Sequence, residues 1–178
     1  APEERARTVT RLFAEAAEAL ATVHRAGLLH RDVKPANLLI ARDGTVRLAD
    51  FGIALDKRHA QESFDAGTLR YLSPERIEGI EDPSSDVYAL GVSMLVALIL
   101  EPVFSQRAIM ELRVAIGSGI PELALTKAKG VAPRLLAITR RACARNAADR
   151  YPDAAELARD LRELLDQKWY SRQPVLIG

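Results

Sequence analysis

The 178 residues of this chain are enough for one domain with a buried core. The 25 basic and 24 acidic side chains nearly cancel, so the overall charge gives no reason to expect binding to nucleic acid or an anionic membrane. The single cysteine, Cys143, excludes an internal disulfide. We expect it to be a small buried residue of a cytoplasmic protein.

The first predicted element is an amphipathic helix over residues 4–26. Apolar side chains recur there at the three- and four-residue spacing of one helix face, and Gly27 marks the end. His24 falls near the end of that face. We expect it to be packed or to cap a helix, and we assign it no chemistry.

A polar loop and a hairpin come next in the chain. The loop is His30-Arg31-Asp32-Val33-Lys34-Pro35-Ala36-Asn37, and its proline keeps it out of a helix. The apolar residues 38–40 then begin a strand, and Asp43-Gly44 predicts a tight hairpin turn. The returning strand, residues 45–48, leads to Asp50-Phe51-Gly52.

Hairpin pairing brings four of these side chains together. The start of the first strand and the end of the second lie at the same end of an antiparallel hairpin, so Asn37 and Asp50 should be neighbours. Their oxygens suit Mg²⁺, which takes few protein ligands plus substrate phosphates. Lys34 suits a transferring phosphate, and Asp32 is left to accept a proton from an attacking hydroxyl.

Three motifs in this order resemble those of protein kinases. His30-Arg31-Asp32 with Asn37 resembles the catalytic loop, Asp50-Phe51-Gly52 the metal-binding triplet, and Ser73-Pro74-Glu75 the end of the activation segment. Lys34-Pro35 after Asp32 is similar to the serine/threonine branch. The resemblance implies ATP and Mg²⁺ as cofactors, a protein substrate, and Leu39 as the floor of the adenine site.

The resemblance also implies supporting roles. His30 would pack beneath Phe51, and Asp86 would accept backbone hydrogen bonds from the catalytic loop, although a bare helix-capping role would also explain an aspartate there. Thr68 would bridge Asp32 and Lys34. Glu75 would form an ion pair with Arg150, which serves the scaffold.

Residues 53–66 lack a clear period and are predicted to form the surface loop that corresponds to an activation segment. Ser63 is the only hydroxyl residue between Gly52 and Thr68, so it is a candidate phosphorylation site. Its phosphate would pair with Arg31 and order the loop. An ordinary exposed serine is the alternative.

The remaining predicted elements are helices. Ser73 and Pro74 start a short one that ends near Gly79. A second helix start, Pro83-Ser84-Ser85-Asp86, leads into the apolar run from Val87 to Leu100, which predicts a central core helix and is too short to span a bilayer. Three more are expected over residues 105–116, 133–144 and 153–167, the last opened by an Asp153/Glu156 capping box.

The resemblance covers only the larger lobe of a kinase. Neither a glycine-rich phosphate loop nor a strand lysine precedes residue 30, since Lys34 is the first lysine. We therefore expect a mainly α fold with a small β-hairpin: a kinase-like C-lobe over residues 1–168, with 169–178 as tail or linker. The small lobe is expected upstream in the same polypeptide.

Two other functions compete with the kinase interpretation. A kinase-like scaffold or binding module is one, although Asp32, Lys34, Asn37 and Asp50 are all present together. A small-molecule phosphotransferase is the other, but it would have no use for the segment from Gly67 to Glu75. Without a small lobe, the 178 residues alone are expected to be inactive.

Overall fold

A computed structural model of the chain describes residues 2–51, 66–128 and 130–170. In these ranges the chain forms eight α-helices, two short 3-10 helices and one two-stranded antiparallel sheet. The predicted fold class, mainly α with a small β-hairpin, is confirmed. Among the described helices, none combines the length and the apolar character needed to cross a bilayer.

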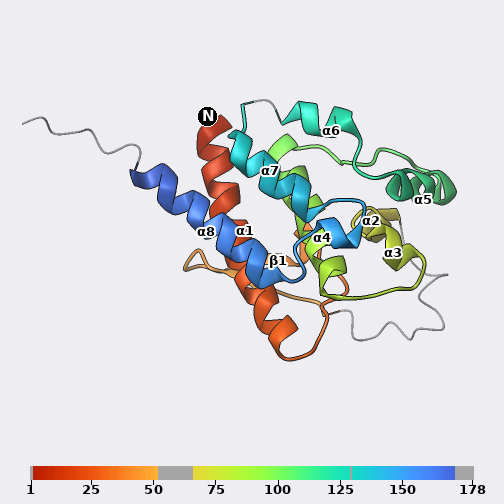
Figure 1. Ribbon diagram of the computed structural model, residues 1–178, viewed down its shortest axis with the longest axis horizontal. Helices are drawn as coiled ribbons and strands as arrows, with labels where there is room; N and C mark the ends of the chain where they lie inside the picture. The colour runs from red at the N-terminus through yellow and green to blue at the C-terminus, as the bar shows by residue number, and fades with distance from the viewer. Residues whose placement is uncertain (1, 52–65, 129, 171–178) are drawn as a thin grey trace, which may run out of the picture.

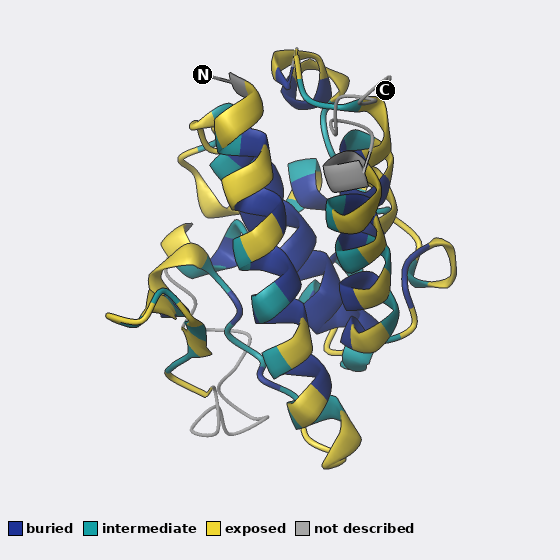
Figure 2. Ribbon diagram, turned by 90° about the vertical axis from the view of Figure 1, so that its left-hand side faces the viewer, coloured by how far each residue is buried: buried dark blue, intermediate teal, exposed yellow. Residues whose placement is uncertain are grey.

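The core is a bundle built around helix α4 (Pro83–Ile99). Helix α1 (Pro2–Arg25) runs alongside α8 (Ala154–Tyr170), and both contact α4, which also packs on α7 (Pro133–Ala142) (Figure 1). Residues 84–95 of α4 are all buried, and its ribbon lies in the buried centre of the bundle (Figure 2). The prediction of a central core helix is confirmed.

The start of α4 is capped by a residue that the sequence interpretation did not single out. The side chain of Asp82 accepts the Ser85 N–H at 3.1 Å, and the Ser85 hydroxyl accepts the Asp82 N–H at 3.4 Å. This reciprocal pair satisfies two amides that a helix start leaves open. Asp86 follows Ser85 inside the first turn of α4 and is not the N-cap.

The predicted hairpin is present as β1 (Leu38–Ile40) and β2 (Val46–Leu48), with Leu38 opposite Leu48. Its turn includes Gly44 at a φ of 83°, which a glycine adopts without strain. Glu15 of α1 fixes the hairpin against the bundle, since its Oε2 accepts the Val46 N–H at 3.0 Å.

The first helix after α4 differs from the prediction in both of its ends. Helix α5 (Ile109–Ser118) begins four residues after Ser105, because the Arg70 guanidinium donates to the carbonyls of Phe104 and Gln106 and holds that segment out of a helix. The helix also continues past its predicted end at residue 116. Gly117 lies within it, and Gly119, at a φ of 93°, marks its end.

Two short helices were not predicted, α2 (Ala66–Leu69) and α6 (Glu122–Lys127). Helix α3 (Pro74–Ile77) follows Ser73 as expected, but the Ser73 side chain makes no capping hydrogen bond. A 3-10 turn, η1 (Pro35–Asn37), ends the catalytic-loop segment, and a second, η2 (Ala147–Asp149), precedes Arg150.

Helices α7 and α8 keep their predicted places with shifted ends. Helix α7 stops at Ala142, two residues before the predicted end, and the Ala144 carbonyl accepts from Arg150 Nε at 2.7 Å. Asp153 Oδ1 accepts the N–H groups of Ala155 and Glu156 and so supplies the predicted cap of α8. That helix continues to Tyr170, three residues beyond the predicted end.

Candidate active site

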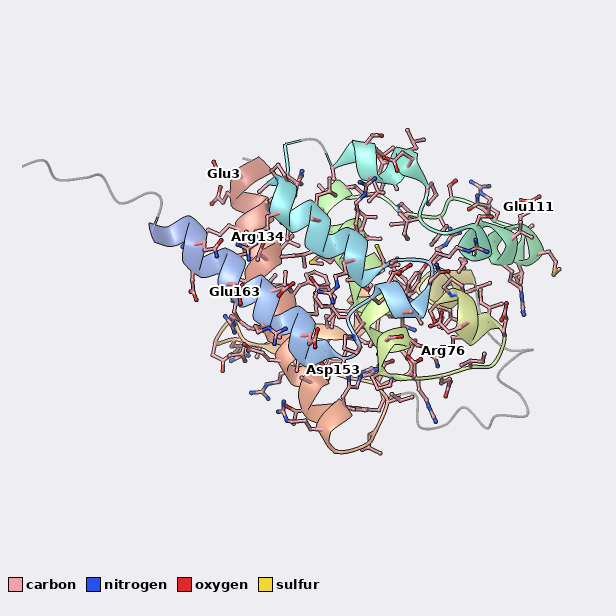
Figure 3. The ribbon with its side chains drawn as sticks, in the orientation of Figure 1. Glu3, Arg76, Glu111, Arg134, Asp153 and Glu163 are labelled. Carbon is pink, nitrogen blue, oxygen red and sulfur yellow. The ribbon has the colours of Figure 1, made fainter. Side chains whose placement is uncertain are left out.

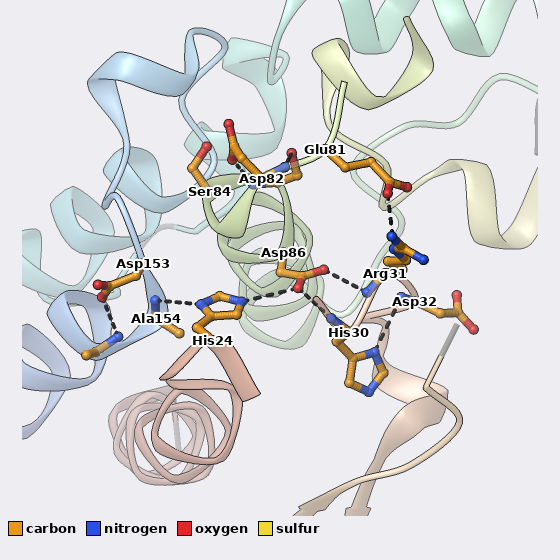
Figure 4. Close-up of polar contacts among 12 residues, drawn as sticks. His24, His30, Arg31, Asp32, Glu81, Asp82, Ser84, Asp86, Asp153 and Ala154 are labelled. Atoms are coloured by element: carbon orange, nitrogen blue, oxygen red, sulfur yellow. Dashed lines mark hydrogen bonds and ion pairs between the residues drawn. The ribbon is translucent and has the colours of Figure 1, made fainter. Parts of the chain in front are cut away.

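Asp86 anchors the predicted catalytic loop to the core. Its Oδ2 accepts the His30 N–H at 2.8 Å and its Oδ1 accepts the Arg31 N–H at 2.9 Å (Figure 4). The expected hydrogen bonds from the loop to this residue are therefore present. Because α4 is buried on all sides, the carboxylate that holds the loop is itself immobilised.

His24 is a member of this network that the sequence interpretation left without chemistry. Its Nε2 lies 3.2 Å from Asp86 Oδ2, and its Nδ1 accepts the Ala154 N–H at 3.4 Å (Figure 4). An Nδ1 that accepts requires the proton on Nε2, which then donates to Asp86. His24 thus caps the first turn of α8 and also steadies the residue that holds the catalytic loop.

The Asp32 carboxylate is held by two neighbours from its own loop. Asn37 Nδ2 donates to Asp32 Oδ2 at 2.9 Å and to the Asp32 carbonyl at 2.7 Å. Lys34 Nζ lies 3.0 Å from the same Oδ2 and donates to Thr68 Oγ1 at 2.9 Å. Among the contacts of the described residues, Thr68 is therefore linked to Asp32 through Lys34. These contacts fall on Oδ2, so Asp32 Oδ1 receives none of them.

The hairpin brings Asn37 and Asp50 to one end, as predicted. The Ala49 N–H donates to the Asn37 carbonyl at 3.0 Å, next to Asp50. Asn37 is buried, and its Nδ2 is committed to Asp32, so its Oδ1 is the atom left to act as a ligand. Asp50 is exposed, at a φ of 53°. An amide oxygen and a carboxylate fit a hard cation such as Mg²⁺.

His30 and Phe51 form the expected stacked pair, with ring centroids 4.6 Å apart. His30 is fully buried, and burial lowers the pKa of its imidazole. The Asp32 N–H lies 3.3 Å from His30 Nδ1, which accepts it when the ring is neutral. Leu39, on the adjacent strand, is 52% exposed and faces away from the core.

The expected ion pair between Glu75 and Arg150 is present and bidentate. Arg150 Nη1 and Nη2 lie 2.6 and 2.8 Å from the two Glu75 oxygens, and the arginine side chain is fully buried. Burial is the largest single influence on the pKa of Glu75 and would raise it, but the hydrogen bonds to the carboxylate, that of Arg150 foremost, and the Arg150 charge together outweigh it and lower that pKa to about 2. The other Arg150 N–H groups donate to three carbonyls, those of Ser84, Ala144 and Arg145.

Two charged residues next to the loop were missed by the sequence interpretation. Arg76 follows the Ser-Pro-Glu triplet, and Glu81 lies in the connection to α4; both approach Arg31 (Figure 3 labels Arg76). Neither belongs to a recognised motif, so the sequence carried no signal for them. Ser63 and Gly52 lie outside the described residues.

The family-model comparison agrees with this geometry. The protein kinase domain model matches residues 3–170. The chain belongs to the protein kinase family. The match spans all the elements that place Asp32, Lys34, Asn37 and Asp50.

Bacterial serine/threonine-protein kinases are similar in sequence to this chain. The serine/threonine-protein kinase PknL of Mycobacterium tuberculosis is 39% identical over 153 residues, which are 83% of this chain and 38% of the relative. PknB of Mycolicibacterium smegmatis is 35% identical over 161 residues, 87% of this chain and 26% of the relative. The chain thus spans well under half the length of these relatives.

Proposed function

We propose that this chain is the substrate-binding and catalytic lobe of a kinase that transfers the γ-phosphoryl group of ATP to serine or threonine of a protein. The observation that carries the proposal is the held carboxylate of Asp32. Among the described residues, Asn37 and Lys34 contact its Oδ2, which leaves Oδ1 there to accept the proton of an attacking hydroxyl. Phosphoryl transfer depends mainly on such positioning and on electrostatics.

The remaining residues have roles that follow from their places. Asn37 Oδ1 and the Asp50 carboxylate would hold Mg²⁺, which neutralises phosphate charge when bound. Lys34 adds a positive charge beside Asp32, and Thr68 orients its ammonium group. Leu39 offers an exposed apolar side chain on which an adenine ring could rest.

We further propose that a second, smaller lobe precedes this chain in the same polypeptide and covers the nucleotide. Leu39 and Ile40 support this, since both are more than half exposed on the hairpin. We also propose that the kinase acts in the cytoplasm, where ATP is present and a free thiol such as Cys143 stays reduced. Phosphorylation of Ser63 remains a proposal that mass spectrometry of the native protein can check.

Substitution of Asp32 tests the proposed function. In the full-length gene product, Asp32→Asn should lower kcat for phosphorylation of a protein substrate by about 10²- to 10⁴-fold, because the general base is lost. Asp166→Asn, an exposed change on α8, is the matched control and should leave kcat unchanged. The isolated 178 residues should show negligible transfer.

Two outcomes would contradict the proposal. Full-length protein that folds and binds ATP yet transfers no phosphate would favour the scaffold alternative. Transfer that survives Asp32→Asn would mean that another group accepts the proton.

A further inference from the structure

Two arginines share one carboxylate behind the catalytic loop. Arg31 Nε lies 3.0 Å from Glu81 Oε2, and Arg76 Nε lies 3.2 Å from Glu81 Oε1. Figure 4 shows the contact between Arg31 and Glu81, which reaches the loop from the segment that leads into α4. The Arg76 side chain is only 5% exposed.

The backbone of Arg31 needs external support. Its φ of 69° lies in the left-handed region, which is unfavourable for a residue with a side chain and persists only where the surroundings enforce it. Asp86 accepts its N–H, and Arg76 Nη1 donates to its carbonyl. Glu81 holds its side chain. All three contacts act on the residue directly before Asp32.

The charges make Glu81 the critical member of this group. Asp86 already accepts two backbone N–H groups and contacts His24, so Glu81 is the carboxylate that both guanidinium groups contact through Nε. Burial lowers the pKa of Arg76, while the charges of Glu81 and Asp86 raise it. Arg76 Nη2 has no hydrogen-bond partner in the described part of the chain. Without Glu81, two neighbouring positive charges would repel, one of them buried.

We propose that Glu81 is a positioning residue for phosphoryl transfer: its carboxylate neutralises Arg31 and Arg76 together and thereby fixes the backbone that aims Asp32. The effect on catalysis rests on the proposed function. Glu81 has no contact with Asp32, Asn37 or Asp50 among the interactions of the described residues, so its action is exerted through the arginines.

Removal and replacement of the carboxylate test this inference in the full-length protein. Glu81→Ala should speed hydrogen–deuterium exchange in a peptide that spans residues 29–34. It should also lower kcat by roughly 10- to 100-fold with little change in the KM for ATP, because Asp32 is misplaced while the nucleotide ligands are intact. Added formate should reverse both effects, since a small carboxylate can refill the space between the arginines, whereas chloride at equal ionic strength should not.

The matched control is Glu101→Ala, which removes a carboxylate paired with Lys127 on the exposed surface. It should change neither exchange in residues 29–34 nor kcat. Should Glu81→Ala fail to fold, Glu81→Gln removes the charge while it keeps the shape, and allows the same comparison of exchange and kcat.

Unchanged exchange and kcat in a folded Glu81 variant would overturn the inference. So would losses in Glu81→Ala that formate does not reverse, because they would reflect general packing and not the missing anion. A wild-type protein without kinase activity would contradict the proposed function instead, and the exchange and formate measurements would still decide the role of Glu81.

Discussion

Arg150 shows how burial changes the value of an ion pair. Its guanidinium contacts both oxygens of Glu75 and three backbone carbonyls, and its side chain is fully buried. Arg162 makes an equally bidentate pair with Glu18, but there both side chains are more than two-fifths exposed. The two pairs have the same chemistry and differ in their access to water.

Arg150→Met should therefore destabilise the chain by about 3–5 kcal/mol, because it removes the cation from the largely buried Glu75 carboxylate and leaves three carbonyls without their donor. Arg162→Met, the matched control, should cost no more than about 1 kcal/mol. Urea unfolding of both variants measures the difference. Equal costs would show that the burial of the Arg150 pair has no energetic weight.

Motif residues and the supports that the family resemblance names, such as Asp86 and His30, could be predicted from the sequence, whereas supports outside the motifs could not. The places of Asp32, Asn37 and Asp50 follow from hairpin pairing, and the Glu75–Arg150 contact from the family resemblance. His24 reaches Asp86, which holds the catalytic loop, and Glu81 reaches Arg31 of that loop, in both cases from segments with no recognised motif. His24 is brought to Asp86 by the contact between α1 and α4. A single sequence contains no signal for such contacts.

At the scale of elements, the contact between α4 and α7 depends on a missing side chain. A Cβ placed on Gly91 would lie 2.8 Å from Ala142 Cβ and 3.0 Å from the Cys143 nitrogen. Both neighbours belong to the end of α7 and cannot turn aside as a long side chain would. The glycine sets how closely the two helices approach.

Gly91→Ala should therefore destabilise the chain by about 1–3 kcal/mol through overpacking. Gly117→Ala on α5 is the control, because nothing lies within 4 Å of its added Cβ. It should stabilise the chain by up to about 1 kcal/mol, since alanine favours a helix. Thermal unfolding of the two variants should shift in opposite directions, and a harmless Gly91→Ala would contradict the close approach.

Strong periodicity made some elements predictable. The helix at residues 4–26 and the apolar helix from Pro83 appear close to their expected bounds, because spacing and punctuation agree there. The start of α5 was wrong because Arg70, distant in sequence, takes two carbonyls of the preceding segment. Helix α6 is only six residues long, too short to show a period.

At the scale of the whole molecule, stability should depend on pH through His30. Its pKa is lowered in the folded state by burial, while the unfolded histidine has a pKa of about 6.5. Above that pH both states are neutral and the full stability is present. As the pH falls below it, the unfolded state binds a proton that the folded state excludes, so stability is lost.

The free energy of unfolding should accordingly decrease between pH 7 and pH 5, by at most about 1.4 kcal/mol per pH unit for this one proton. Chemical denaturation at a series of pH values measures the slope. Nuclear magnetic resonance of the His30 ring tests whether this residue causes the slope. If the His30 ring of the folded protein titrated at an ordinary histidine pKa, His30 would not be the cause.

The hold of Asp86 on the catalytic loop has a consequence for engineering. The backbone of His30 and Arg31 is held by the Asp86 carboxylate on α4. That carboxylate contacts His24 at the end of α1, and the other ring nitrogen of His24 accepts the first N–H of α8. The loop is therefore not a portable module. A designer who moves residues 30–37 to another scaffold would have to move the junction of three helices with them.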